Sequence, residues 1–395
     1  MPIAIVGAGP YGLLYGLKLL RRGIEAVILE EHVNVGLPDH CAGLISVNTL
    51  RSLGVGEAPV LSRVKGAYIY PPSAKRPLVV NPGKVVAVVV DRPRLDATLA
   101  EAFESEGGNL LTGKRVREVI NTESAAAVRC GSYRFEADFL AIAVGAGRML
   151  PASAGFDKVE GVLPALQADV VGLDFERDMV EVYLSTRLFP GLFGWLVPRG
   201  DKEARVGVVG TAPLARLKLL IRKRSAAAGK VSRPRIVSFH GGLVVTGGPL
   251  RVFHSLRALV LGDAAGHTKP TTGGGLAFAP ITTDIAVEAT QKALEESRNA
   301  LAEYTKNWWR VLGFEIRSML ILRRLLNSLD DKELEELLKA VKEAGFEEIA
   351  VSWGDMDRQA GLILKAGIRS IGRLVKKPVL AKSILLSLAK AFLLH

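Results

Sequence analysis

The first thirty residues change structural period twice. Residues 3–6 are a short apolar run typical of a buried strand, residues 10–22 have helical spacing, and residues 26–29 are a second apolar run. This order predicts a βαβ unit, whose two strands run parallel because the helix carries the chain back to the edge where the first strand began. The chain is therefore expected to build an α/β domain around a parallel sheet.

Three glycines and one acid stand at characteristic places in this unit. Gly7, Gly9 and Gly12 form GxGxxG at the turn from the first strand to the helix, and Glu30 ends the second strand. Gly7 permits a tight turn, Gly9 lets a pyrophosphate approach the backbone, and Gly12 lets the helix pack closely on the sheet. Glu30 is expected to accept hydrogen bonds from ribose hydroxyls, while the helix N-terminus offers free N–H groups to phosphates. The pattern predicts a dinucleotide site.

A second glycine-rich stretch, "LGDAAGHTKPTTGGG", occupies residues 261–275. An apolar strand delivers Asp263 to the carboxyl end of the sheet, where open α/β folds bind ligands. The glycines then lead into a long helix, so Gly274, Gly275 and Leu276 form a second open helix start. Two such sites suit one long ligand, and we expect FAD. Asp263 would bind its ribitol hydroxyls, and the later N–H groups would face the pyrimidine edge of the flavin.

The remaining pattern divides the chain into three parts. Residues 1–150 and 251–295 are expected to form the FAD-binding domain, interrupted by a strand-rich substrate-binding segment at 151–250. Residues 296–395 are expected to be a C-terminal helical region. The predicted fold class is therefore α/β: a Rossmann-like FAD-binding domain with a parallel sheet, an inserted antiparallel-sheet domain and C-terminal helices.

Composition disfavours several other classes of protein. The chain has 395 residues, of which 49% are hydrophobic, enough for a sizeable core. No window of eighteen or more residues is both apolar and uncharged, and the N-terminus lacks the features of a signal peptide, so a cytosolic protein is expected. Cys41 and Cys130 are too few for a disulfide framework, and no metal site is expected. Low usage of Asn, Gln and Cys is mildly typical of a thermophile.

The formal charge of +12 comes largely from the C-terminal tail. From Gly361 to His395 there is no acidic residue, and seven basic residues alternate with aliphatic ones. Nucleic-acid binding is disfavoured because Phe392 is the only aromatic residue in this tail. Two interpretations stay open: a helix that lies on a membrane surface, or an amphipathic helix that packs on its own domain. The seven residues are Lys365, Arg369, Arg373, Lys376, Lys377, Lys382 and Lys390.

Several motifs carry a resemblance to a known family. "GAGPYG" with Glu30, then "DRPRLDATLAEA", then "GDAAGHTKPTTGGG" resemble the FAD-dependent group that includes aromatic hydroxylases, halogenases and geranylgeranyl reductases. "PDHCAGLIS" resembles the P-x-x-C-x-G loop of the geranylgeranyl reductases, and "FGWLVP" resembles their Y-x-W-x-F-P motif. Phe193 stands where that motif has tyrosine and Val197 where it has a second aromatic residue, so prenyl preference is expected to differ.

The resemblance implies reduction of carbon–carbon double bonds in isoprenoid chains, in archaea those of digeranylgeranylglyceryl membrane lipids. It places Arg92 and Ala42 at the cofactor, and Phe193, Trp195 and Pro198 at the substrate. The alternative for Arg92 is an ion pair with Asp96, and the alternative for Trp195 is ordinary core packing. An unactivated alkene needs a hydride from flavin N5 and a proton, in a pocket that excludes water.

Cys41 and the electron donor are the remaining open points. A thiol in this loop would lie near the flavin, where it donates a proton, gates the redox state or only packs, whereas Cys130 is expected to be structural. No second GxGxxG follows another strand, so the donor is expected to be transiently bound NAD(P)H or a ferredoxin-like protein.

Two alternative functions stay open. One is an FAD-dependent monooxygenase or halogenase, and the other is a non-enzymatic prenyl carrier, which the intact glycines and acids disfavour.

Overall fold

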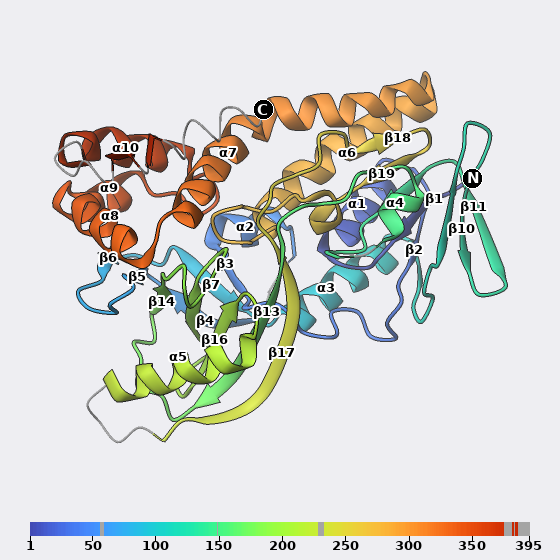
Figure 1. Ribbon diagram of the computed structural model, residues 1–395. Coiled ribbons are helices and arrows are strands. Elements are labelled where there is room, and N and C mark those ends of the chain that lie inside the picture. The colour runs from blue at the N-terminus through green and yellow to red at the C-terminus, as the bar shows by residue number, and fades with distance from the viewer. Residues whose placement is uncertain (56–58, 148, 228–232, 375–380, 383, 386–395) are drawn as a thin grey trace.

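The computed structural model describes residues 1–55, 59–147, 149–227, 233–374, 381–382 and 384–385 (Figure 1). A six-stranded sheet forms the first layer, in the order β18-β19-β12-β1-β2-β8. All its pairs are parallel except β18–β19. The strands are β1 (Ile3–Val6), β2 (Ala26–Leu29), β8 (Asn109–Leu111), β12 (Leu140–Ile142), β18 (His254–Ser255) and β19 (Ala258–Val260). Every residue of β1 and β2 is buried, as expected for a parallel sheet covered on both faces.

Helices from distant parts of the chain cover this sheet. α1 (Pro10–Leu20) follows β1 directly and packs against both α3 (Arg92–Ser105) and α6 (Ala279–Glu295). Two short 3-10 helices, η1 (Gly262–Ala265) and η2 (Leu276–Phe278), lie between β19 and α6. The two glycine-rich stretches of the sequence therefore belong to neighbouring elements of one layer (Figure 1).

A seven-stranded sheet forms the second unit, in the order β17-β13-β16-β15-β14-β5-β6. Its pairs are antiparallel except β14–β5. α5 (Pro213–Ala227) covers one face of it. Two strands come from residues 66–80, so this sheet extends beyond the predicted segment 151–250. Its strands are β5 (Gly66–Tyr70), β6 (Leu78–Val80), β13 (Val162–Val171), β14 (Met179–Tyr183), β15 (Gly194–Pro198), β16 (Glu203–Val209) and β17 (Arg235–Val245).

Two three-stranded sheets complete the strand content. One consists of β3 (Leu44–Ser46), β7 (Ala87–Val90) and β4 (Val60–Val64), and β3 continues into α2 (Val47–Ser52), which the Ser46 side chain caps. The other consists of β9 (Glu118–Asn121), β10 (Ala126–Cys130) and β11 (Tyr133–Ala137), with the one-turn helix α4 (Leu150–Ser153) beside β9. The first of these sheets brings the segment after Cys41 next to the seven-stranded sheet through a shared aliphatic cluster.

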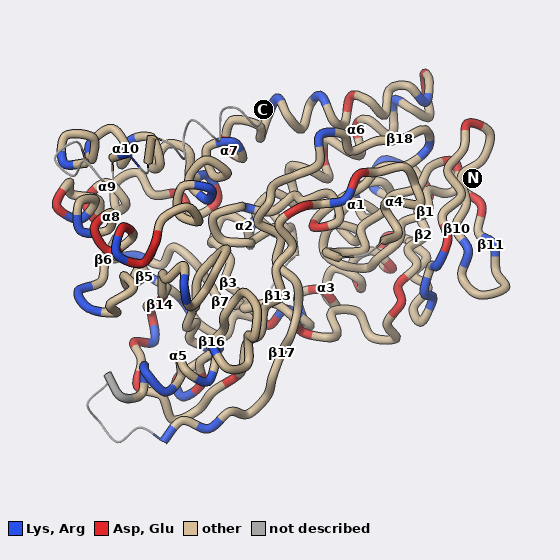
Figure 2. The backbone as a smooth tube through the Cα atoms, viewed as in Figure 1, with Lys and Arg blue, Asp and Glu red and all other residues tan. Residues whose placement is uncertain are grey.

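The C-terminal region is helical. η3 (Arg298–Leu301) leads into the long α7 (Ala302–Ser328), which is followed by α8 (Asp331–Glu343), α9 (Phe346–Trp353) and α10 (Ala360–Leu374). Figure 1 shows α8, α9 and α10 gathered at one end, beside β5 and β6. Figure 2 shows acidic residues crowded on α8 and basic residues on α10. Among the tail residues discussed above, Lys376, Lys377, Lys390 and Phe392 lie outside the described residues.

The predicted fold class is confirmed: a parallel-sheet FAD-binding layer, antiparallel sheets and C-terminal helices are all present. Within the described ranges, no helix combines the length and the apolar character needed to cross a membrane.

Candidate functional site

The N-terminus of α1 has the backbone geometry that the glycine pattern predicts. A Cβ added to Gly7 would lie 2.5 Å from the Ala143 carbonyl oxygen, and one added to Gly12 would lie 2.1 Å from the Gly7 carbonyl oxygen. Beside Gly9, by contrast, no atom lies within 4 Å of the Cβ position. Gly9 is the N-cap of α1, and within the described ranges no side chain caps this helix. The open helix start fits a pyrophosphate, because its free N–H groups are donors for an anion.

Glu30 lies at the end of β2, directly beneath this turn. Its Oε2 accepts the N–H of Ala8 at 2.8 Å, and its Oε1 accepts the N–H of His32 at 2.8 Å. The His32 Nδ1 atom lies 2.7 Å from the same Oε1. The carboxylate is therefore held in place by the protein, with lone pairs left for ribose hydroxyls. His32 was not singled out from the sequence, since a single exposed histidine after a strand carries no pattern.

Asp263 lies in η1, just after β19, and its carboxylate has no hydrogen-bond partner among the described residues. Burial raises its pKa from the ordinary value of 3.8 to about 6, although the positive charge of Arg92 acts in the opposite direction. Gly275 leaves room beside it, since a Cβ there would lie 3.0 Å from Asp263 Oδ1. Gly274 is exposed and Leu276 begins η2. A partly buried acid without a protein partner fits the hydroxyl groups of a ligand.

Arg92 connects Asp263 to Cys41. It is the first residue of α3, and its Nη2 lies 3.0 Å from Asp96 Oδ1, so the ion pair considered from the sequence is present. Burial alone would lower the pKa of Arg92, but the charge of Asp96 and the interaction with Cys41 raise it overall. Cys41 Sγ also accepts the N–H of Gly43 at 3.4 Å. Three predicted site residues, from segments far apart in the chain, therefore lie together.

The side of the seven-stranded sheet opposite α5, here called the Trp195 face, turns toward this group. Phe193 and Trp195 share that face, with ring centroids 6.2 Å apart and planes at 86°. Trp195 packs against the aliphatic cluster to which Ala42 and Met356 also contribute. Pro198 does not join them, because side chains alternate along β15 and Pro198 points to the other side. Its predicted role in substrate binding stays a prediction.

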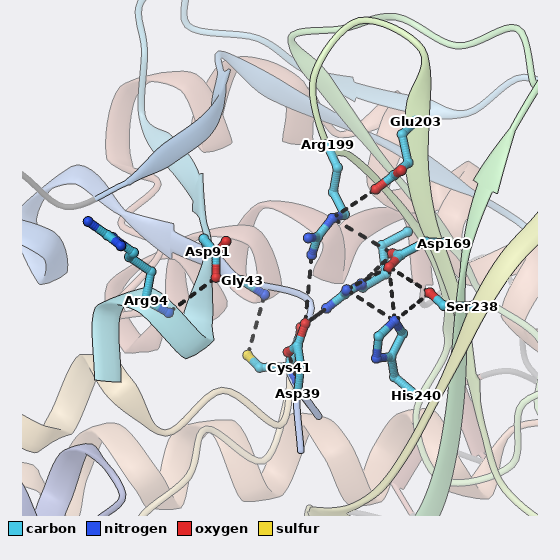
Figure 3. Close-up of polar contacts among 11 residues, drawn as sticks. Asp39, Cys41, Gly43, Asp91, Arg94, Asp169, Arg199, Glu203, Ser238 and His240 are labelled. Atoms are coloured by element: carbon cyan, nitrogen blue, oxygen red, sulfur yellow. Dashed lines mark hydrogen bonds and ion pairs between the residues drawn. The ribbon is translucent and has the colours of Figure 1, made fainter. Parts of the chain in front are cut away.

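A buried charge cluster ties the Cys41 loop (residues 37–43) to the Trp195 face (Figure 3). Arg205 is 1% exposed, and its Nη1 donates to Asp39 Oδ2 at 2.8 Å and to the Cys41 carbonyl oxygen at 2.6 Å. Its Nε and Nη2 donate to the two oxygens of Asp169 at 2.7 and 2.9 Å. Ser238 and His240 complete the cluster, at 3.0 and 2.9 Å from Asp169 Oδ2. This fully paired cluster fixes the loop that carries the thiol.

No sequence pattern indicated this cluster. Asp169, Arg205 and His240 occur singly within alternating strands, a pattern that usually marks a solvent-facing side. A second missed element is the segment 355–359, which holds the glycine-rich loop after Asp263. Buried Lys269 donates from Nζ to the Met356 carbonyl oxygen at 2.8 Å and lies 3.6 Å from Asp357 Oδ1. The C-terminal region is therefore part of the site.

Comparisons with known proteins agree with this geometry. Residues 1–216 match the family model described as "FAD binding domain". An uncharacterized protein of Methanocaldococcus jannaschii is 28% identical over 92% of this chain and 94% of its own length. Digeranylgeranylglycerophospholipid reductase 2 of Methanothermobacter thermautotrophicus is 26% identical over 86% of this chain and 91% of its own length.

The likeness extends to solved structures. A geranylgeranyl bacteriochlorophyll reductase-like protein of Thermoplasma acidophilum superposes with a TM-score of 0.82 and 22% identity, over 95% of this chain and 98% of the other. The predicted resemblance to the geranylgeranyl reductase group is therefore confirmed, and so is FAD as the cofactor. Since the family match spans more than half of the chain, the protein belongs to the FAD binding domain family and is an FAD-dependent oxidoreductase.

Proposed function

We propose that this oxidoreductase reduces carbon–carbon double bonds in the isoprenoid chains of geranylgeranyl-type membrane lipids. The observation that carries the proposal is an aliphatic and aromatic surface facing the Cys41–Arg92–Asp263 group. Phe193, Trp195, Ala42 and Met356 contribute to this surface, and a hydrocarbon chain is the ligand it suits. Relatives named digeranylgeranylglycerophospholipid reductase, aligned over most of their length, support the same substrate class.

The chain's own residues account for binding, exclusion of water and proton supply. FAD held at the α1 N-terminus, Glu30 and Asp263 would, when reduced, supply the hydride for one alkene carbon. The Trp195 face holds the hydrocarbon and keeps water away from the reacting atoms. Cys41 Sγ gives its proton to the second carbon, so that one C=C becomes CH–CH. Arg92, which interacts with Cys41, stabilises the thiolate left behind until water returns a proton.

Two partners belong to the same proposal. The electron donor is NAD(P)H or a ferredoxin-like protein, and mixing the oxidised enzyme with each under anaerobic conditions shows which one bleaches the flavin.

The second partner is an anionic membrane surface. α10 packs through Ala360 and Ser370 but exposes Leu364, Ile368 and Ile371, and it carries Lys365, Arg369 and Arg373. Flotation with anionic and with neutral vesicles tests this contact.

The first experiment measures turnover directly. The purified holoenzyme is reduced with dithionite without oxygen, a geranylgeranylated glycerolipid is added, and flavin reoxidation is followed together with product mass. We expect reoxidation and products heavier by two hydrogens for each reduced bond. A reduced flavin that persists with lipid but reacts rapidly with oxygen would contradict the proposal and favour a monooxygenase.

The role of Cys41 is tested by Cys41→Ser. We expect the variant to keep its flavin and to lose alkene reduction by roughly a hundredfold or more, since serine is a far weaker acid and general-acid catalysis contributes about 10²–10⁴-fold. Cys130→Ser is the matched control, because Cys130 ends β10 in the small sheet with β9 and β11. Full activity of the Cys41 variant would show that this thiol only packs.

A further inference from the structure

Two buried polar groups on the Trp195 face have no hydrogen-bond partner among the residues that the structure describes. Gln167 is 3% exposed, and neither its amide nitrogen nor its amide oxygen makes a hydrogen bond within the described part of the chain. The indole Nε1 of Trp195 is likewise buried and unpaired there. Buried polar side-chain atoms are nearly always hydrogen-bonded, so two adjacent exceptions on one surface indicate a ligand that supplies the missing partners.

The sheet register brings these groups together. Gln167 on β13 and Trp195 on β15 both pair with Gly207 of the intervening β16. Directly paired residues project to the same face of a sheet, so both side chains rise from the Trp195 face on either side of Gly207.

Glycine at position 207 lets the indole lie over the middle strand. A Cβ there would be 2.1 Å from Trp195 Cζ2 and 2.7 Å from its Nε1. The indole, including its nitrogen, therefore lies over Gly207, the residue that pairs with Gln167 on the other side. A glycine inside a strand commonly marks such a close approach.

The neighbouring charges do not satisfy this pair. Asp169 and Arg205, the next cross-strand pair on the same face, are bonded to each other, and Arg205 is also bonded to the Cys41 loop. Gln167 and Trp195 are uncharged, and together they offer two kinds of donor and one acceptor. They suit a neutral group with an oxygen atom, since an ion would be buried here without a counter-charge.

We infer that Gln167 and Trp195 form a hydrogen-bonding subsite for an uncharged, oxygen-bearing group of the bound ligand. Resting on the proposed function, the inference assigns to this subsite an ether or hydroxyl oxygen of the glycerolipid. A carbonyl group of the flavin has the same chemistry, and the experiment separates these two sources. A ligand made only of hydrocarbon leaves both groups unpaired and binds less well.

The test uses Gln167→Met, which keeps the length of the side chain and removes its polar atoms. Equilibrium binding to the oxidised holoenzyme is measured by tryptophan fluorescence, so no turnover is required. The two probes are a digeranylgeranylglyceryl ether lipid and squalene, an isoprenoid hydrocarbon. We expect the variant to bind the ether lipid about tenfold more weakly and squalene unchanged. Its unfolding midpoint should be equal to or above that of the wild type, since a buried unpaired amide is removed.

Thr246→Val is the matched control. Thr246 is also buried, but its hydroxyl is satisfied by the Gly161 carbonyl oxygen at 3.2 Å. This variant should lower the unfolding midpoint and leave lipid binding unchanged, the opposite of what we expect for Gln167→Met. Trp195→Phe provides a second measurement of the subsite, with the same selective loss of ether-lipid affinity.

Each remaining outcome decides the inference. If Gln167→Met weakens FAD binding or shifts the flavin absorption band while lipid affinity stays constant, the subsite exists and the flavin supplies the oxygen. A lowered unfolding midpoint with unchanged lipid and flavin binding would show that the amide is structural, and the inference is overturned. If the wild type binds neither lipid, the proposed function fails, and the flavin measurements with the unfolding midpoint decide the subsite separately.

Discussion

Asp263 and Asp169 are carboxylates on opposite walls of the same site, and their pKa values shift in opposite directions. Asp263, at the end of β19, lacks a partner within the described residues, and burial raises its pKa to about 6. Burial would also raise the pKa of Asp169, but hydrogen bonds and positive charge from Arg205, with help from His240, lower it. The difference separates two kinds of polar group: one kept unpaired for a ligand, and one fully paired to hold a loop in place.

The largest effect is expected from removing the centre of the paired cluster. Arg205→Met removes the guanidinium that is hydrogen-bonded to Asp169 and Asp39 and leaves Arg199 as their remaining guanidinium, at 3.7 and 4.0 Å. Breaking such a buried pair costs about 3–5 kcal/mol. We expect this loss in the free energy of unfolding, measured with urea, with little change in flavin content. Arg205→Lys keeps the charge but not the forked geometry, so it should lose less. If Arg205→Met lost as much flavin as an Asp263 variant, the structural role of the Asp169–Arg205 pair could not be distinguished from the FAD-binding role of Asp263.

A smaller effect with the opposite signature is expected from Asp263→Ala. The FAD dissociation constant should rise by the equivalent of about 1–3 kcal/mol, because a hydrogen bond to a charged acceptor disappears. The unfolding free energy of the apoprotein should stay constant or increase, since an unpaired buried acid is removed. Asp284→Ala, on the exposed side of α6, is the control for losing a surface carboxylate and its ion pair with Lys18. Unchanged FAD affinity would remove Asp263 from the cofactor site.

A third difference between the two acids lies in how their contributions to the free energy of unfolding depend on pH. With a native pKa near 6 and an ordinary value of 3.8, folded Asp263 binds more protons than the unfolded chain in this interval, so its contribution to stability falls as the pH rises through it. The contribution of Asp169, whose pKa is lowered, is complete above its ordinary value of 3.8 and is lost as the pH falls further.

Apoprotein unfolding, followed between about pH 3.5 and 7.5 for the wild type and Asp263→Asn, separates the two contributions. The variant should match the wild type near the acidic end and exceed it near neutral pH. A constant difference across the range would show that the Asp263 carboxyl titrates normally in the folded protein.

Much of the predicted FAD site could be predicted from the sequence, whereas little of the Trp195 face of the seven-stranded sheet could. Gly7, Gly9 and Gly12 act through the backbone of one continuous βαβ unit, so their spacing alone carries the information. Arg205, Asp169 and Gln167 act through the surroundings of a sheet face. In the sequence they are single polar residues in alternating strands, and nothing local distinguishes a face covered by another segment from one exposed to water.

The sequence by itself therefore determined the fold class and the glycine turn after β1, because each depends on residues close together in the chain. Tertiary structure decided which polar groups are paired. It placed the Cys41 loop in hydrogen-bond contact with Arg205 and added residues 66–80 to the seven-stranded sheet. It also placed Lys269 beside Asp357. It also left the Gln167 amide and the Trp195 indole nitrogen without a hydrogen bond in the described part of the chain. Burial and pairing are properties of distant segments in contact, and these properties set the free energy of every charged or polar group in the site.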